Sequence, residues 1–518
     1  MEIVLGVVAL LLLSIISVAV GEKIGLPWPA LLSVVAMVIV FIPGIPALNV
    51  PADLILPIFL PPLLWALARR TSWGVIRQQW LTIVSLSVLL VVVTTAAVGA
   101  AAYVFLPGVG VAAALLIGAA IAPPDPVAVD AVAEPAGIPR RIISALQTEG
   151  LFNDAASIVV FHMALLAVTR GAELSVGEGI LKFAYSAAVA SVIGLLVGRV
   201  ASWFIKHVHD VTARNALTWV IPFATYILSE ELGASGVIAV VIAAVELNSR
   251  APIEAEDRVS GQAFWSTVDL LFTGLAFGLI GLSVNDAITQ VGSDLWHSVL
   301  VGVILSLVAF AVRLAWMYIF YRINLRRGKP GVAPLRLQEV LLMTWSGMRG
   351  LVTLALVLSV PSGAIPFYNE LAVIALTVLL VTMVLPGMLL PWLMSKLDLA
   401  ADSQAASDKM HAEVTERARK AAIDSLRKQH DDLDPEVAAN IDDWFDKVFG
   451  TDDLDAEDQK ARLEKAHRAR AFAAQARATA FQASQSVLLE MRNDPRYNPA
   501  LVDEVLHEVD RMVLAARK

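Results

Sequence analysis

The chain has 518 residues, of which 57% are hydrophobic and only 17% are charged, and its formal net charge is −8. This composition excludes an ordinary soluble protein with a charged surface, and the charge balance gives no basic footprint for nucleic acid. Because the chain contains no cysteine, disulfides, thiolate metal sites and cysteine nucleophiles are excluded as well.

Apolar runs predict an all-α polytopic membrane protein with about 13 transmembrane helices. A helix needs roughly 17 to 25 apolar residues to cross the hydrocarbon core, with allowance for short and broken helices. The first run lacks the basic segment that precedes the apolar part of a signal peptide, so we interpret it as a retained span. The runs cover approximately residues 3–20, 28–43, 53–68, 80–106, 110–133, 142–169, 177–205, 214–229, 233–247, 263–283, 296–321, 337–360 and 370–395.

Basic residues in the loops predict the orientation of these spans. Short loops rich in lysine and arginine stay in the cytoplasm. Here they occupy alternate loops, and the opposite set contains only Arg170. We therefore expect a plasma membrane protein, in a bacterial inner membrane, with the N-terminus outside and the C-terminus cytoplasmic. The alternating loops carry Lys23, Arg69, Arg70, Arg77, Arg140, Arg141, Lys206, Arg214, Arg250, Arg258, Arg322, Arg326, Arg327, Lys329 and Arg336.

The fifth run is interrupted by prolines around an acid, at Pro123, Pro124, Asp125 and Pro126. Proline removes a backbone donor and clashes with the preceding turn, so a continuous helix cannot form here. Broken backbone is tolerated at membrane depth only where protein or a water-filled cavity satisfies it, and secondary transporters build ion sites in this way. Asp125 is therefore a candidate ion ligand, the alternative being a hydrogen-bonded acid in a kinked structural helix.

The sixth run carries two acids, Glu149 and Asp154, together with Gly150 and Asn153. A charged side chain at the centre of a membrane helix costs roughly 2.5 to 3.5 kcal/mol on insertion scales. On a continuous helix, Gly150, Asn153 and Asp154 share one face, while Glu149 lies about 140° away from Asp154. We expect the two acids to have different partners. Burial disfavours the charged form of a carboxyl group, so Asp154 can exchange a proton for a small hard cation.

Two later runs add polar residues. The twelfth contains the segment WSGMRG with Gly347, Arg349 and Gly350, seven spans after the proline interruption. An inverted repeat of six spans plus one linker span has this spacing, with its two broken helices meeting in the centre. Arg349 either compensates the carbonyl end of a half-helix or snorkels to the inner surface. Arg313 in the eleventh run needs an acid, and Glu149 is the best candidate.

The composition changes after the last span. Residues 398–518 are charged and rich in alanine, which predicts a soluble helical cytoplasmic tail. The tail has no phosphate-binding glycine loop and no metal-ligand spacing. A helical bundle or a helix lying along the membrane domain is the simpler interpretation, and a regulatory or dimerising role is the alternative.

Over residues 1–397 the chain resembles the monovalent cation:proton antiporters of the bacterial NhaP and eukaryotic NHE kind. The most specific matching segments are PDPVAV at 124–129 and EGLFND at 149–154. The resemblance implies an electroneutral sodium/proton antiporter that works by alternating access. It implies no enzyme activity and no cofactor, because Na⁺ and H⁺ are the transported substrates. Weaker matches are SGVIA at 235–239, FW at 264–265, FGLIGL at 277–282 and GMRG at 347–350.

The resemblance also implies roles for single residues. Asp154 is the carboxylate that binds Na⁺ or a proton, and Asn153 replaces the second aspartate of charge-moving relatives. Glu149 and Arg313 form a structural ion pair, while Asp125, Pro124 and Gly150 adjoin the ion. Three departures leave the choice among sodium, potassium and lithium open. Threonine is frequent in the family where this chain has Pro124, serine where it has Gly150, and some members have a glutamate where it has Ala66.

Finally, the resemblance implies a division of residues 1–397. Spans 1–3 and 8–10 form the dimer domain of a homodimer, spans 4–6 and 11–13 form the moving core, and span 7 links them. The mid-membrane charges named above all fall in the core half. Two other hypotheses are a gated cation channel, which would carry current without proton counterflow, and an intramembrane hydrolase using Asp125 and Asp154.

Overall fold

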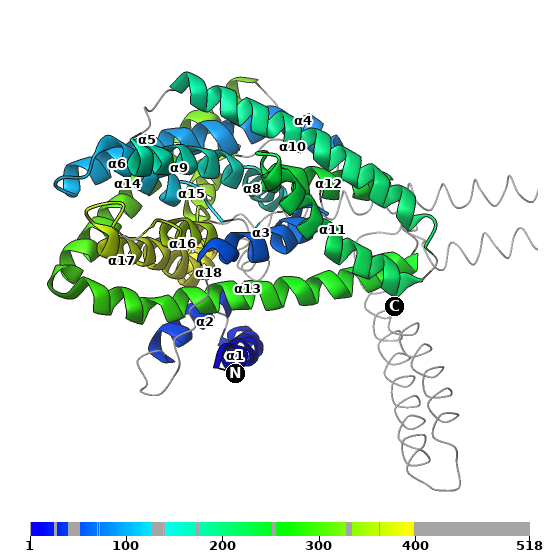
Figure 1. Cartoon of the computed structure of the whole chain (residues 1–518), viewed down its shortest axis with the longest axis horizontal. Coiled ribbons are helices and arrows are strands. Elements are labelled where there is room, and N and C mark those ends of the chain that lie inside the picture. The colour runs from blue at the N-terminus through cyan, green and yellow to red at the C-terminus, as the bar shows by residue number, and fades with distance from the viewer. Residues whose placement is uncertain are drawn as a thin grey trace, which may run out of the picture. The chain divides into compact units, whose positions relative to one another are not determined.

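The computed structural model describes residues 2–24, 28–39, 52–69, 71, 73–125, 138, 140–171, 176–208, 210–250, 255–327, 334–361 and 363–397. Within these residues every regular element is a helix (Figure 1). Pro126, the rest of the expected fifth span and the tail at 398–518 lie outside the described residues. The predicted all-helical class is confirmed for the part that is described.

The helices follow one another without strands between them. Two segments are π-helices, η1 (Val84–Leu89) and η3 (Leu380–Val384), and η2 (Gly292–Asp294) is a single 3₁₀ turn. The α-helices are α1 (Glu2–Ile24), α2 (Trp28–Ile39), α3 (Ala52–Ala68), α4 (Trp73–Ile83), α5 (Leu90–Phe105), α6 (Val111–Ile121), α8 (Arg140–Gly150), α9 (Asn153–Arg170), α10 (Val176–Ile205), α11 (Val211–Glu231), α12 (Gly236–Arg250), α13 (Ala255–Val291), α14 (Leu295–Arg327), α15 (Leu337–Trp345), α16 (Leu351–Leu358), α17 (Tyr368–Leu379) and α18 (Leu385–Leu397).

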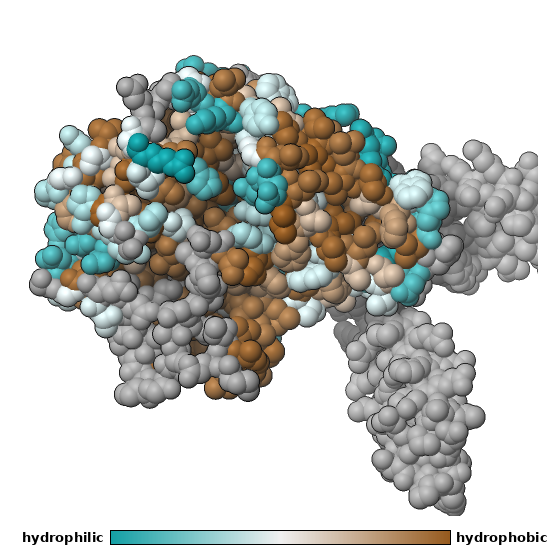
Figure 2. All heavy atoms as spheres, in the orientation of Figure 1, coloured by the Kyte–Doolittle hydropathy of each residue, from teal (hydrophilic) through white to brown (hydrophobic). Residues whose placement is uncertain are grey.

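Many of these helices suit a membrane. Large apolar side chains are exposed along α10, among them Leu181, Val192 and Leu196, as expected for a helix in contact with lipid. Figure 2 shows hydrophobic side chains gathered on the surface where α10 and α11 lie. The count of about 13 spans stays a prediction. Six helical segments among the described residues are long and apolar enough to cross a membrane: Val4–Ile24, Trp80–Phe105, Ala145–Arg170, Gly177–Ile205, Leu295–Arg326 and Tyr368–Leu397.

The sixth expected span appears as the apolar segment Ala145–Arg170, but it is interrupted, so the assumption of one continuous helix from Glu149 to Asp154 was wrong. Helix α8 ends at Gly150, a turn follows at Leu151 and Phe152, and α9 begins at Asn153. The backbone of Phe152 has φ −128° and ψ −9°, outside the helical region. The Asn153 side-chain oxygen accepts the N–H of Asp154, which satisfies one of the donors that a helix start leaves unpaired. Because of this interruption, Glu149 and Asp154 lie on two separate helices and not on two faces of one helix.

The helices pack as two groups. The first group comprises α1, α2, α3, α11, α12 and α13, and α10 packs on its member α12. The second group comprises α5, α6, α9 and α14 to α18. The groups meet where α13 packs against α17 and where α3 packs against α16 (Figure 1).

Glycines allow a close helix crossing, that of α10 on α12. A Cβ atom added at Gly194 would lie 2.6 Å from the carbonyl oxygen of Ala239, and one at Gly198 would lie 2.8 Å from the Cβ of Glu246. Small residues four apart let two membrane helices approach to backbone contact. These two glycines therefore fix α10 against α12.

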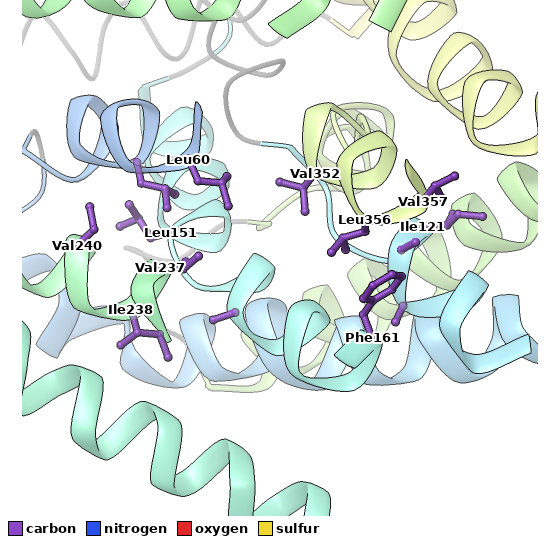
Figure 3. Packing of buried hydrophobic residues seen from close by; sticks show 14 of the residues in the cluster. Leu60, Ile121, Leu151, Phe161, Val237, Ile238, Val240, Val352, Leu356 and Val357 are labelled. Atoms are coloured by element: carbon purple, nitrogen blue, oxygen red, sulfur yellow. The ribbon is translucent and has the colours of Figure 1, made fainter. Parts of the chain in front are cut away.

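The largest buried hydrophobic cluster draws on both groups. It includes Leu60 of α3, Val240 of α12, Ile121 of α6, Phe161 of α9 and Leu356 of α16, all shown in Figure 3. Ile121 ends α6 and Leu356 belongs to the short helix that begins at residue 351. The hydrophobic core therefore includes residues of α6 and α16, the short helices on either side of the contact between the two interrupted segments.

Candidate functional site

Asp125 joins the two interruptions. Its backbone N–H donates to the carbonyl oxygen of Met348 at 2.7 Å, and its Oδ2 accepts from the N–H of Leu351 at 3.2 Å. Leu351 is the first residue of α16, so the carboxylate occupies the positive end of that helix. The segment after Ile121 and the segment after Trp345 therefore meet at Asp125.

The two glycines of the second interruption leave room for charged side chains. A Cβ atom at Gly350 would overlap the Asp125 carboxylate, and one at Gly347 would overlap the side chain of Arg313. Both φ and ψ of Gly350 are −146°, so the requirement here is space. Glycine is therefore required at these positions because the side chains of Asp125 and Arg313 occupy the space of a Cβ atom.

Arg349 lies at the carbonyl end of α6. It is 3% exposed, its Nε donates to the carbonyl oxygen of Ile121 at 3.2 Å, and its Nη1 donates to that of Gly347. Ile121 is the last residue of α6, where the helix dipole favours a cation. Of the two alternatives for Arg349, the structure therefore shows the first, in which its charge lies at the carbonyl end of a short helix. The side chain does not snorkel to the surface.

Asn153 and Asp154 begin α9 and are buried. The Asn153 amide nitrogen donates to the carbonyl oxygen of Pro124 at 2.5 Å, and its oxygen accepts the Asp154 N–H at 2.7 Å. One turn further, the Ser157 hydroxyl donates to the carbonyl oxygen of Ala119 at 2.6 Å. None of the hydrogen bonds among the described residues uses a carboxylate oxygen of Asp154, which is 3% exposed. The start of α9 is therefore fixed while its carboxylate is left for another partner.

Asp125 and Asp154 face the same cavity. Its other lining residues are apolar, and they come from α3 and α13 of the first helix group and from α16 of the second. The cavity therefore lies between the two groups, with the two carboxylates as its ionisable side chains. The apolar lining is Leu60, Leu63, Leu64, Leu67, Ala276, Phe277, Leu351 and Val352.

Glu149 has a different partner, Arg313, as charge compensation in the sequence predicted. Arg313 Nη1 lies 2.5 Å from Glu149 Oε1, Nη2 donates to Oε2 at 2.9 Å, and Nε donates to the carbonyl oxygen of Met343 at 3.0 Å. Both residues are 2% exposed. The Ser87 hydroxyl in η1 donates to the Glu149 backbone carbonyl at 2.6 Å. This is a fully buried bidentate pair, the geometry in which arginine and a carboxylate interact most strongly.

The remaining predicted residues lie close by, apart from the cavity. Gly150 is buried at the end of α8, and Pro123 is buried after α6. Neither is among the cavity residues, nor is Ala66 of α3. Pro126 lies outside the described residues.

Sequence reasoning missed the apolar wall of the cavity. Leu60, Leu63, Leu64 and Leu67 recur at the spacing of one helix face, which was the available signal. In a span that is apolar all round, this face does not stand out. Phe277 is the first residue of the weaker match FGLIGL, which did not indicate that it lines a cavity.

Comparisons with known proteins agree on one kind of protein. A family model described as sodium/hydrogen exchanger, transmembrane, matches residues 8–396. The chain is 25% identical over 501 residues to the uncharacterized Na⁺/H⁺ exchanger YjcE of Escherichia coli, with 88% of each chain covered. It is 28% identical over 473 residues to a sodium, potassium, lithium and rubidium/H⁺ antiporter of Bacillus pumilus, covering 86% of this chain and 69% of that one.

A solved structure has the same fold. The sodium proton antiporter MjNhaP1 of Methanocaldococcus jannaschii superposes with a TM-score of 0.59 at 20% sequence identity. The match covers 77% of this chain and 99% of that one.

Proposed function

The chain belongs to the sodium/hydrogen exchanger family, and from that premise we propose that it exchanges Na⁺ for H⁺ across the plasma membrane by electroneutral, alternating-access antiport. The observation that carries the proposal is the cavity between the two helix groups, which the carboxylates of Asp125 and Asp154 both line. Carboxylate oxygens suit a hard alkali cation.

Asp154 is the proposed carrier of either ion. A buried carboxylate is costly unless a proton or a cation neutralises it, so it alternates between the two ligands and does not stay empty. A site that holds one ion at a time exchanges them by competition. Asp125 already accepts the Leu351 N–H at the start of α16, so we assign it the role of a fixed charge that helps hold the cation.

Asn153 supports an electroneutral cycle. Its neutral amide donates to the Pro124 carbonyl and accepts the Asp154 N–H, so it orients both without titrating. With one titrating carboxylate per cycle, one proton leaves for each monovalent cation that binds. Glu149 and Arg313 then form a structural pair, because both oxygens of Glu149 are taken by the guanidinium.

The proposed architecture is an inverted repeat of about 13 spans whose two broken helices cross. The hydrogen bonds of Asp125 to both interruptions support the crossing. The expected dimer spans 1–3 and 8–10 correspond to α1–α3 and α11–α13, which pack on one another. Sliding of the second group against this one would open the cavity to each side in turn. We further propose a homodimer in lipid with the N-terminus outside and the tail cytoplasmic.

A broader cation preference is the second candidate. Apart from the two carboxylates, the side chains lining the cavity are apolar, and Pro124 and Gly150 lack the hydroxyl groups that the family resemblance implies at these positions. A cation would then keep some water, which weakens discrimination by size. The relative from Bacillus pumilus is named for sodium, potassium, lithium and rubidium. Potassium or lithium exchange is therefore the alternative to sodium preference.

Reconstituted vesicles with an internal pH dye test the proposal. Addition of Na⁺, K⁺ or Li⁺ should change the internal pH, at a rate that does not depend on whether the membrane potential is collapsed. Asp154→Asn should abolish the change for every cation and still purify as a folded protein. Asp294→Asn, which alters an exposed carboxylate after α13, is the matched control. An active Asp154→Asn protein would disprove the assignment.

A further inference from the structure

A second buried carboxylate lies away from the cavity and holds two arginines. Glu246, near the end of α12, is 3% exposed. Arg199 Nε of α10 donates to its Oε1 at 3.1 Å, Arg250 Nε bonds to the same oxygen, and Trp73 Nε1 donates to Oε2 at 2.9 Å. None of these four residues lines the cavity of Asp154.

The two arginines keep donors for an outside acceptor. Both bond to Glu246 through Nε, and their side chains are 52% and 54% exposed. A guanidinium has five N–H donors in a rigid fork. Within the part of the chain that the structure describes, no acceptor takes the four donors on the Nη atoms of either arginine. Two guanidinium groups against one carboxylate leave one net positive charge. The cluster is therefore anchored on its buried side and cationic on its open side.

The cluster lies at one end of three helices. Arg250 ends α12, Trp73 begins α4, and Arg199 lies in the last two turns of α10. Asn248 also donates to the carbonyl oxygen of Thr71, which ties α12 to the segment before α4. On the proposed orientation this is the cytoplasmic side.

Apolar and aromatic side chains next to Arg199 place the cluster at the depth of lipid headgroups. Val200, Trp203 and Phe204 on α10 are 64%, 61% and 47% exposed, and the exposed Lys206 follows them. Exposed tryptophan in a membrane helix collects at the interface between hydrocarbon and water. An acyl chain can therefore lie along α10 while its phosphate reaches the arginines.

We propose that Arg199 and Arg250 form a site for the phosphate of an anionic phospholipid, with Glu246 as the residue that positions both guanidinium groups. Arginine forks match phosphate oxygens in pairs, and basic pockets between membrane helices on the cytoplasmic side suit anionic headgroups. Because Arg199 belongs to α10 and Arg250 to α12, a bound lipid would also hold these two helices together.

Thermal unfolding of the purified full chain in a neutral detergent tests the site. Phosphatidylglycerol should raise the unfolding temperature, whereas phosphatidylcholine should not. Arg199→Lys/Arg250→Lys keeps the charge but removes the forks, so it should need roughly tenfold more phosphatidylglycerol for half of the shift. Arg322→Lys/Arg326→Lys changes two exposed arginines at the end of α14 and should leave the shift unchanged.

Each other outcome counts against the site. An unchanged shift in Arg199→Lys/Arg250→Lys would mean that any basic surface suffices. An equal shift with phosphatidylcholine would mean a bulk lipid effect, and an equal shift with inorganic phosphate alone would mean a soluble anion. Every shift is measured against the lipid-free baseline of the same variant. If the double variant does not fold, the single Arg250→Lys protein and a count of bound phosphatidylglycerol by native mass spectrometry decide the question.

Discussion

Glu149 and Asp154 are five residues apart and equally buried, at 2% and 3% exposure, yet their surroundings differ. Both oxygens of Glu149 accept hydrogen bonds from Arg313, in a pair closed off from the cavity. The Asp154 carboxylate faces the cavity, beside Asp125 and a wall of leucines. The turn at Leu151 and Phe152 separates the two.

The difference shows how one short segment can carry both a fixed and an exchangeable charge. A buried carboxylate with a complete partner has little to gain from a proton or a cation, so its charge holds helices together. A buried carboxylate without such a partner is stabilised by whatever small ion reaches it. The following predictions test this contrast, from the largest expected effect on stability to the smallest.

Removing one member of the closed pair should have the largest effect. Arg313→Met leaves Glu149 buried without its partner, which costs roughly 3 to 5 kcal/mol. We expect a strong drop in the unfolding temperature and in the yield of monodisperse protein. Arg313→Met/Glu149→Gln removes the uncompensated charge and should recover most of the loss. If Arg313→Met alone unfolds like the unaltered protein, the structural role of the pair is wrong.

Crowding the open site should have an intermediate effect. Gly350→Ala places a methyl group on the Asp125 carboxylate and forces it away from the Leu351 N–H, at a cost of roughly 1 to 3 kcal/mol. Exchange in vesicles should fall with it. Gly110→Ala is the matched control, because nothing lies within 4 Å of the added atom and φ there is −72°. Equal behaviour of the two variants would show that the crossing tolerates displacement of Asp125.

Much of this contrast was open to sequence reasoning. Charge compensation indicated that Arg313 needed Glu149, and the prolines and glycines indicated two interruptions that meet. The break before Asn153 was not predictable, because no proline marks it and because the bond from the Asn153 side chain to Pro124 joins residues 29 apart. The position of Arg349 was left open, because its burial depends on the carbonyl end of α6 lying beside it in space. The sequence does not show that contact. These outcomes depend on tertiary contacts, which local patterns do not contain.

A smaller effect should follow from loosening the support of the closed pair. Ser87→Ala removes the hydroxyl that donates to the Glu149 carbonyl, a loss of about 1 kcal/mol. Thermal unfolding should detect a modest decrease, with exchange retained. Ser395→Ala removes an exposed hydroxyl bonded to Trp392 and should change neither property. Loss of exchange in Ser87→Ala at normal stability would mean that the closed pair takes part in transport.

Neutralising the open carboxylate should change stability least. Asp154→Asn keeps the shape of the side chain and removes a charge that lacks a described donor, so the unfolding free energy should change by roughly 1 kcal/mol or less. The distinguishing property is linkage to sodium. In the unaltered protein, Na⁺ at ten times its dissociation constant should stabilise the fold by about 1.4 kcal/mol, and Asp154→Asn should lose this gain. Because protons compete for the same oxygens, the gain should shrink as pH falls. Sodium stabilisation that persists in Asp154→Asn, or that grows in acid, would place the cation on another group.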